Sequence, residues 1–272
     1  MLPILPPMSK LILGAPDAIT ARFCCERLGA QYIWASSFVM SSMLGLRDEG
    51  MINIDNFISL LKGIVSGATK PVLLDFDVGG KSIDEFRRNL ESLQSLKLGG
   101  VCIEDENWPK KNAMLSGAQR TLASSLLMTE KIKMAKRLMG PDSLVVARTH
   151  SLIAKESVSA LQNRVKNYQA AGADVLCVHY TDNDWKWYKR RIDGLSVKIP
   201  LLLILSNFNF SPKSLPDFDY VLFPNQVYRI MLYPILNKLE SVAPGRMLSF
   251  RKCEIIETKA LFGIVEDIYE TH

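Results

Sequence analysis

The chain has 272 residues and a formal net charge of +5, and nearly half of its residues are hydrophobic. Because this length can bury a substantial core, we expect one globular domain of the α/β class over residues 1–272. The positive charge is spread along the chain instead of forming a basic block. This argues against a nucleic-acid-binding surface and indicates a solvated surface with mild attraction for anionic substrates.

The cysteines lack the spacing of a metal site or of a small secreted domain. Two of them lie within apolar strand-like runs, which indicates small buried thiols in a reducing compartment. The N-terminus, MLPILPPMSK, is interrupted by three prolines, and no apolar run is long enough to span a membrane. We therefore expect a cytoplasmic protein without a membrane partner.

Short β-rich runs alternate with amphipathic stretches along most of the chain. Eight strands are predicted, in chain order, at Lys10–Leu13, Tyr32–Ala35, Val72–Asp75, Gly100–Glu104, Leu144–Arg148, Val175–His179, Leu201–Leu205 and Tyr220–Phe223. Helices are predicted around Asp17–Leu28, Ile54–Ser66, Ser82–Leu96, Ser124–Met139, Ser151–Ala171, Asp184–Gly194 and Val227–Leu239.

This alternation, repeated about eight times in about 250 residues, is typical of a (β/α)8 barrel of the TIM type. An open doubly wound sheet is the alternative, but no glycine-rich turn follows the first predicted strand as a dinucleotide-binding fold requires. Residues 241–272 show no further strand pattern and are predicted to form a C-terminal helical extension. Its helix, around Ile255–Glu270, is expected to pack on the barrel or on a neighbouring subunit.

Four consecutive predicted strands end in charged or ionisable residues. The third ends at Asp75 with Asp77 two residues beyond, and the fourth ends at Glu104, followed by Asp105. Arg148 and His179 end the next two. Because the carboxyl ends of barrel strands form the active-site face, we expect these side chains to share one site.

Asp75 and Asp77 occupy alternate positions, so in an extended chain they point the same way and can meet Glu104 from the next strand. Three carboxylates without clustered cysteine or histidine suit a hard ion such as Mg²⁺. The alternative is that these acids cap the following helices or pair with surface lysines. The second acidic strand end favours the metal.

Arg148 follows wholly apolar residues and suits bidentate recognition of a carboxylate or phosphate, although a structural ion pair with one of the acids is the alternative. A single histidine such as His179 is often a packed hydrogen-bonding group, but its alignment with the other strand ends favours a role in the site. The loop after Glu104 carries Lys110, Lys111 and Asn112. It is interpreted either as a loop that closes over an anionic group or as an exposed basic turn.

Taken together, motifs from about Gly14 to Arg229 resemble the phosphoenolpyruvate mutase branch of the isocitrate lyase superfamily. They read GAPDAITARFCCERLGAQYIWASSF, GLRDEG, VLLDFDVGG, GVCIEDENWPKKNAML, VARTHSLIA and GADVLCVH, in this order. The resemblance implies a (β/α)8 barrel whose terminal helix is swapped between subunits of a homodimer or homotetramer. It also implies Mg²⁺ held by Asp75, with Asp77 and Glu104 acting directly or through water.

The same resemblance implies roles for residues around the metal. Ser36 and the amide of Ser37 match positions that hold the substrate carboxylate beneath Trp34, and Asp48 matches an aspartate near the migrating phosphoryl group. The remaining matches are the substrate-binding residues Arg148 and His179, the loop donors Lys110 and Asn112, and the late pair Asn225 and Arg229 in PNQVYR, whose role is less defined.

The activity implied is an isomerisation that moves a phosphoryl group between the enol oxygen and the methylene carbon of pyruvate. It interconverts phosphoenolpyruvate and phosphonopyruvate and forms the P–C bond of phosphonate biosynthesis. Mg²⁺ and Arg148 would stabilise the enolate, while Lys110, Asn112 and Arg148 hold a metaphosphate-like group. Asp48 would either form a covalent intermediate or position the group.

Other activities of the superfamily remain as alternatives. Its C–C lyases carry a loop cysteine in KKCGH, whereas this chain has no cysteine between Cys102 and Cys177. Phosphonopyruvate hydrolase shares almost all of the site, and an oxaloacetate decarboxylase needs the same metal-stabilised enolate. A non-catalytic binding protein is a further alternative. The small-molecule partner is thus a 2-oxo acid or an enolpyruvate phosphate.

The chain departs from the usual motifs at several positions. Where the pattern EDKxxPKTNS is usual, Glu106 replaces lysine, Lys111 replaces threonine and Ala113 replaces serine. The tyrosine of DTGYGN is lost from DFDVGGKS, and His150 occupies a position that is usually acidic. These changes keep the predicted metal ligands but alter their surroundings, which can change substrate choice. The choice among mutase, hydrolase and a modified substrate therefore stays open, as do the oligomer size and the pathway.

Overall fold

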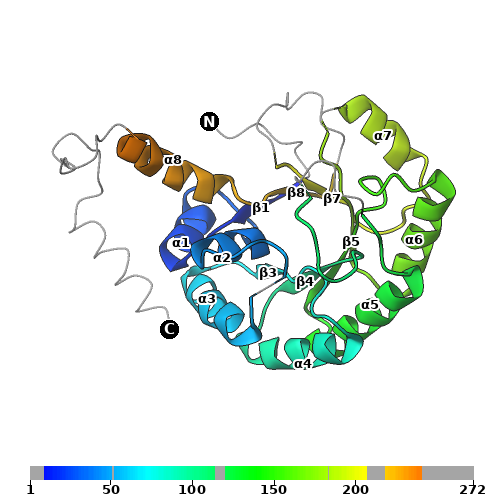
Figure 1. The fold of residues 1–272 in the computed structure, drawn as a ribbon, viewed down its shortest axis with the longest axis horizontal. Coiled ribbons are helices and arrows are strands. Elements are labelled where there is room, and N and C mark those ends of the chain that lie inside the picture. The colour runs from blue at the N-terminus through cyan, green and yellow to red at the C-terminus, as the bar shows by residue number, and fades with distance from the viewer. Residues whose placement is uncertain (1–8, 51, 114–119, 183, 207–217, 241–272) are drawn as a thin grey trace.

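The computed structural model describes residues 9–50, 52–113, 120–182, 184–206 and 218–240. Eight parallel strands form a nearly closed barrel, with helices around its outside (Figure 1). This confirms the predicted (β/α)8 fold. The predicted C-terminal extension at 241–272 and the swap of its helix between subunits lie outside the described residues.

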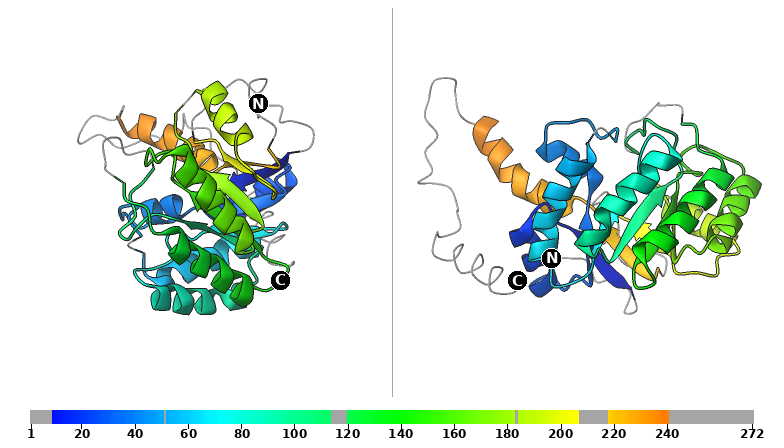
Figure 2. Two further views of the ribbon diagram at one scale, coloured as in Figure 1. Left: turned by 90° about the vertical axis from the view of Figure 1, so that its right-hand side faces the viewer. Right: turned by 90° about the horizontal axis from the view of Figure 1, so that it is seen from below.

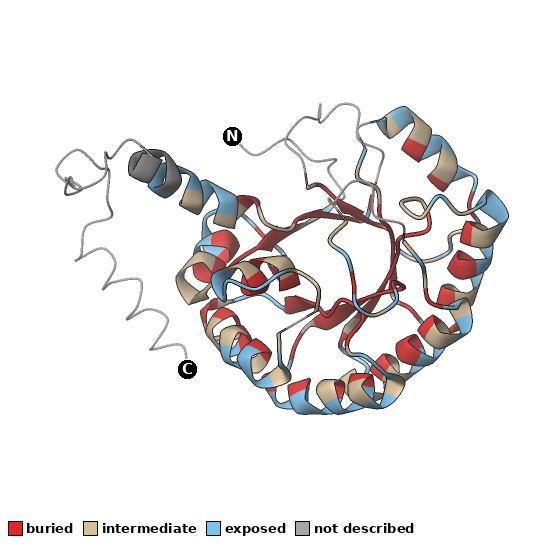
Figure 3. Cartoon of the chain, viewed as in Figure 1, coloured by how far each residue is buried: buried red, intermediate tan, exposed pale blue. Residues whose placement is uncertain are grey.

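All eight predicted strands are present, with their ends within one residue of the expected positions. They are β1 (Lys10–Gly14), β2 (Tyr32–Ala35), β3 (Val72–Asp75), β4 (Gly100–Glu104), β5 (Leu144–Thr149), β6 (Val175–Val178), β7 (Leu202–Ile204) and β8 (Tyr220–Phe223). Nearly every residue in them is buried, because one face meets the barrel interior and the other meets the helices. Figure 3 shows the buried strands as a ring inside half-exposed helices.

The helices between the strands are amphipathic, with buried residues on the face toward the strands. They are α1 (Ala18–Glu26), α2 (Ser37–Met43), α3 (Ile54–Gly67), α4 (Ile83–Leu93) with a 3-10 turn η1 (Gln94–Leu96), α5 (Ser125–Met139), α6 (Val158–Ala170), α7 (Trp185–Asp193) and α8 (Gln226–Glu240). Figure 2 shows that α8 projects away from the rest of the barrel. Among the described residues, no helix combines the length and the apolar character needed to cross a bilayer.

One helix prediction requires correction, and one helix was missed. The helix predicted at Ser151–Ala171 begins at Val158, because the Ser157 hydroxyl accepts a hydrogen bond from the amide of Ala160 at 3.2 Å and caps it there. The residues before it form turns, in which Lys155 has a φ of 56°. The helix α2 was not predicted. It is short and lacks a charged face, and Ser36 caps it.

The barrel interior is filled by side chains from the strands, including the fully buried Trp34. A larger apolar cluster lies between the strands and the helices. At the mouth, β1 and β8 approach so closely that a Cβ atom on Gly14 would lie 1.9 Å from the carbonyl oxygen of Pro224. Only glycine fits there without moving the backbone.

Ladders of parallel pairing join seven of the eight neighbouring strand pairs. The eighth junction, between β6 and β7, is held in the described residues by an isolated bridge between Leu176 and Leu201. There the amide of Leu176 donates to the carbonyl of Pro200 at 2.9 Å. This junction is the seam of the barrel.

Candidate active site

A cavity of about 640 Å³ opens at the carboxyl ends of the strands. Its walls bring together residues from β2, β3, β4, β5 and β7 and from the loops that follow the strands. Of the residues predicted for the site, it is lined by Trp34, Ser36, Ser37, Asp48, Asp75, Glu104, Lys110, Asn112, Arg148, His179 and Asn225. Asp77 lies beside it and lines a neighbouring cavity.

Asp75 is the last residue of β3, whereas Asp77 lies in the turn beyond it with a φ of 51°. The expectation that the two point the same way in an extended chain is therefore wrong for Asp77. The turn nevertheless brings both acids to the hydroxyl of Ser37, which lies 2.8 Å from Asp77 Oδ1 and 3.2 Å from Asp75 Oδ2. Neither acid caps the following helix, because Ser82 caps α4.

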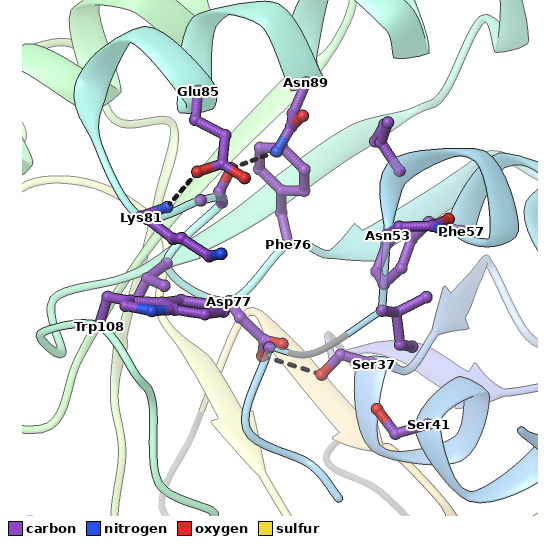
Figure 4. Close-up of a pocket in the computed structure, with 16 residues that line it drawn as sticks. Ser37, Ser41, Asn53, Phe57, Phe76, Asp77, Lys81, Glu85, Asn89 and Trp108 are labelled. Atoms are coloured by element: carbon purple, nitrogen blue, oxygen red, sulfur yellow. Dashed lines mark hydrogen bonds between the residues drawn. The ribbon is translucent and has the colours of Figure 1, made fainter. Parts of the chain in front are cut away.

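Figure 4 shows Asp77 and Ser37 joined by their hydrogen bond at the edge of the neighbouring cavity, which has a volume of about 330 Å³. The indole of Trp108 and the side chain of Lys81 line the same cavity (Figure 4), and the Lys81 amine lies over the indole, 5.6 Å from the ring centroid. Ser37 lines both cavities.

Arg148, near the end of β5, pairs with all three predicted metal ligands. Its Nη2 atom lies 3.0 Å from Asp75 Oδ1 and 3.5 Å from Asp77 Oδ1, and it donates to Glu104 Oε2. Burial alone would raise the pKa of Glu104, but Arg148 and other nearby cations outweigh it and hold this pKa at about 2. Glu104 is therefore ionised at neutral pH, and in this structure Arg148 is an ion-pair partner of the acids.

The loop after β4 inserts Lys110 among the acids. Its amine lies 2.6 Å from Asp48 Oδ1 and 2.7 Å from Asp77 Oδ1, and Lys110 is only 4% exposed. The amide of Asn112 donates to Asp48 Oδ2 at 2.6 Å. Burial opposes the charge of Lys110, but the surrounding carboxylates raise its pKa. Of the two interpretations of this loop, the exposed turn fits Lys111, which is exposed, and does not fit Lys110.

The charges of this group do not balance. Four largely buried carboxylates, of Asp48, Asp75, Asp77 and Glu104, face two cations, Lys110 and Arg148. Burial, reinforced by the neighbouring acids, accordingly raises the pKa values of Asp75 and Asp77. A divalent cation would offset the two surplus negative charges.

The donor set also fits Mg²⁺ in its chemistry. All the ligand atoms would be carboxylate or hydroxyl oxygens, and Glu104 Oε1 is buried without a hydrogen-bond partner. Among the described residues, however, no three acidic, histidine or cysteine side chains are arranged as a ready-made metal site. The Lys110 amine lies among the same oxygens, 2.6 Å from Asp48 Oδ1 and 2.7 Å from Asp77 Oδ1.

His179 follows β6 and is buried. Its Nδ1 atom lies 2.9 Å from Nε2 of His150, and its own Nε2 is buried in the cavity wall without a hydrogen-bond partner. Burial, and then the nearby His150 and Arg148, lower the pKa of His179 well below its usual value, so the ring is neutral at physiological pH. The indole Nε1 of Trp34 is also buried without a partner. Both atoms are thus unpaired polar groups of residues that line the cavity.

A cluster around Glu106 was not predicted as part of the site. Its carboxylate lies 2.8 Å from Nδ1 of His150, accepts from the amide of Lys111 at 2.9 Å and pairs with Arg120. The sequence carried a partial signal, because Glu106 and His150 both depart from the usual charge at their positions. Nothing in the sequence indicated that they meet, since they are 44 residues apart.

The family model described as phosphoenolpyruvate phosphomutase matches residues 8–243. A phosphoenolpyruvate phosphomutase of Streptomyces hygroscopicus is 33% identical over 263 residues, covering 94% of this chain and 82% of the relative. A 2-methylisocitrate lyase of Bacillus subtilis (strain 168) is 29% identical over 244 residues, covering 89% and 76%. The crystal structure of a phosphonopyruvate hydrolase in complex with oxalate and Mg²⁺ shares the fold, with a TM-score of 0.80, 19% identity and coverage of 97% and 92%.

Proposed function

The chain belongs to the phosphoenolpyruvate phosphomutase family, and from this premise we propose that it is a Mg²⁺-dependent isomerase. It interconverts phosphoenolpyruvate and phosphonopyruvate and so forms the P–C bond of phosphonate biosynthesis. One observation carries the proposal: Lys110 and Asn112 of the loop converge on Asp48 at 2.6 Å each, beside Arg148 and three further acids. This set offers donors for a phosphoryl group on one side and oxygen ligands on the other.

The metal would be held by Asp75, with Asp77 and Glu104 acting directly or through water. Bound there, Mg²⁺ would supply Lewis-acid stabilisation of an enolate oxygen. The structure of the hydrolase with oxalate and Mg²⁺ supports this assignment, because oxalate resembles the enolate of pyruvate. The surplus of buried negative charge and the unpaired Glu104 Oε1 support it independently.

The substrate carboxylate would bind the hydroxyl of Ser36 and the amide of Ser37, at the start of α2 and beneath Trp34. The amino end of a helix favours an anion there, although α2 is short. His179 is neutral, and its unpaired Nε2 would contact the oxygen or the reacting carbon of the three-carbon unit. These contacts orient the enolate so that either its oxygen or its methylene carbon can meet the phosphoryl group.

Transfer would proceed through a loose, metaphosphate-like group held by Lys110, Asn112 and Arg148. Lys110 is fully charged at neutral pH because the carboxylates around it raise its pKa. Asp48, which contacts both Lys110 and Asn112, would position the group or accept it transiently. Because Lys110 is buried, its amine would meet the phosphoryl group away from bulk solvent.

Phosphonopyruvate hydrolase is the second candidate. The cavity of about 640 Å³ leaves room for water beside a three-carbon substrate, and the unpaired Nε2 of His179 could orient it. A C–C lyase is disfavoured, because the described part of the loop, Glu106–Ala113, carries Asn112 and no cysteine. An oxaloacetate decarboxylase needs only the metal and the enolate contacts.

We further propose that the protein is a cytoplasmic homodimer or homotetramer. Large apolar side chains of α8 are exposed, namely Ile230, Met231, Tyr233 and Ile235. A second copy of the chain would cover this face. The four cysteines within the described residues are buried and free, which suits a reducing compartment. Light scattering of the purified protein would measure the oligomer size.

Phosphorus NMR of the purified protein with phosphonopyruvate and Mg²⁺ tests the activity. The expected result is phosphoenolpyruvate that is not formed by Asp48→Ala or in the presence of a chelator. Glu130→Ala, at an exposed position on α5 away from the residues that line the cavity, is the control and should keep the activity. Inorganic phosphate as the sole product would move the protein to the hydrolase branch. An unchanged spectrum would refute both, and release of CO₂ from oxaloacetate would then indicate the decarboxylase.

A further inference from the structure

The loop that carries the phosphoryl donors is attached to the barrel through one carboxylate. Glu106 lies two residues beyond β4 and is only 4% exposed. Its Oε2 accepts a hydrogen bond from the backbone amide of Lys111 at 2.9 Å. Lys111 separates Lys110 from Asn112, so this bond holds the backbone between the two donors.

Arg120 holds the same stretch of backbone from the other side. Its guanidinium pairs with Glu106 Oε1 and donates to the carbonyl of Lys111 at 2.9 Å and to that of Asn112 at 2.5 Å. The Arg120 side chain is 3% exposed, so these bonds are formed away from solvent, where charged hydrogen bonds are strong. Glu106 and Arg120 thus clamp residues 110–112.

Glu106 also reaches the opposite wall of the cavity. Its Oε1 lies 2.8 Å from Nδ1 of His150, and Nε2 of His150 lies 2.9 Å from Nδ1 of His179. The backbone amide of His150 is held in turn by Asp105 at 2.9 Å. The ring of His179, which lines the cavity, is therefore oriented through His150, and its Nε2 is left without a partner.

We propose that Glu106 is a positioning residue that, with Arg120 and His150, sets the loop donors Lys110 and Asn112 and the ring of His179 in one arrangement around the substrate. This inference rests on the proposed function, because it assigns those three side chains to substrate. Glu106 itself touches no reacting atom. It acts by holding two walls of the site to a single carboxylate.

The proposal explains two departures from the family motifs together. An acid replaces the usual lysine at position 106, and a histidine replaces the usual acid at position 150. The structure brings the two positions into contact, so the exchange keeps an acid opposite a group that can donate a hydrogen bond. Glu106 additionally gains Arg120 as a partner. The loop is therefore attached in a way that a lysine at position 106 could not provide, because lysine accepts no hydrogen bond.

Two variants weaken these contacts with little change in shape. Glu106→Gln loses the charge and keeps only one of the two acceptor oxygens that hold Lys111, Arg120 and His150, and Arg120→Met loses the guanidinium. Asp174→Asn is the matched control. Asp174 also accepts a backbone amide, that of Val145 at 2.7 Å, and pairs with a side-chain cation, but it lies before β6 at the far end of the barrel. Hydrogen exchange of peptides spanning residues 107–113 is measured without substrate. The exchange rate reports how firmly the loop backbone is held, whether or not the protein is a mutase.

Ring-nitrogen NMR of protein labelled with ¹⁵N-histidine provides the second reading. The chain has three histidines, so the spectrum is simple to assign. Phosphonopyruvate turnover is then measured for all variants, with kcat, KM and the share of inorganic phosphate in the product. The positioning role predicts a lower kcat and a larger share of phosphate at an unchanged overall fold.

Under the proposal, Glu106→Gln and Arg120→Met exchange the loop amides about tenfold faster or more. Glu106→Gln also shifts the ring signals of His150 and His179, and Asp174→Asn changes neither reading. Loop exchange and histidine signals that stay as in the wild type in both variants would overturn the proposal. So would an equal response of Asp174→Asn. A wild-type protein that makes no phosphoenolpyruvate would refute the mutase function alone, because exchange and NMR still decide the positioning role.

Discussion

Replacing Glu104 with glutamine tests the electrostatics of the site directly. Glu104 is 2% exposed, and its pKa of about 2 in the folded protein compares with an ordinary value of 4.5. The difference of about 2.5 units corresponds to about 3 kcal/mol of stabilisation by the ionised form. Because the pKa falls on folding, this stabilisation is complete above about pH 4.5 and is lost as the pH falls toward 2.

Glutamine keeps the shape of the side chain but removes this charge. It also relieves the repulsion between Glu104 and the neighbouring Asp75, which offsets part of the loss. We therefore expect Glu104→Gln to lower the free energy of unfolding by about 1–3 kcal/mol at pH 7 without metal. For a domain of this size, that change corresponds to a decrease of about 2–12 °C in Tm.

Thermal unfolding in EDTA at pH 7 measures the change, and the exposed Glu130→Gln on α5 is the control. At pH 4, the Tm difference between the wild type and Glu104→Gln should be smaller than at pH 7. The reasoning is refuted if Glu104→Gln and Glu130→Gln have the same Tm at pH 7. It is also refuted if the Tm difference between the wild type and Glu104→Gln grows as the pH falls.

Three further predictions concern single positions. Burial lowers the pKa of Lys131 to about 8, so Lys131→Met should raise the free energy of unfolding by about 1–2 kcal/mol at pH 7. Urea unfolding measures this gain, which should disappear as the pH rises from 8 to 10.5. Gly14→Ala should cost about 2–3 kcal/mol by the same assay, because its Cβ would meet Pro224, whereas Gly63→Ala has open space and should be neutral or stabilising. Lys110→Met should lower kcat for phosphonopyruvate about a hundredfold or more, and an unchanged kcat would remove Lys110 from the chemistry.

The strands could be predicted closely because each is an apolar run buried on both faces. The four strand ends that carry Asp75, Glu104, Arg148 and His179 could be predicted for the same reason, since parallel strands deliver their last residues to one edge. The short helix α2 could not. Its sequence, SFVMSSM, has no charged face, and its main signal is the single capping residue Ser36.

The loop contacts depend on the path of the chain, which local sequence patterns do not describe. Lys110 reaches Asp77 across 33 residues, and Asn112 reaches Asp48 across 64. The alternation of side chains along a strand also failed to predict the turn at Asp77, which has a positive φ. The family resemblance named these residues but could not show that Glu106 and His150, the two unusual ones, touch each other.

The seam between β6 and β7 interrupts the ladders of hydrogen bonds that otherwise run around the barrel. Because a single bridge resists separation less than a ladder does, we expect the barrel to widen more readily at this seam than at its other junctions. His179 follows β6 and so lies next to that seam. Small shifts of β6 would change the width of the barrel mouth on this side, while continuous ladders hold the acids of β3 and β4 in place. Substitutions along the seam are therefore expected to change the width of the mouth more than substitutions on β3 or β4.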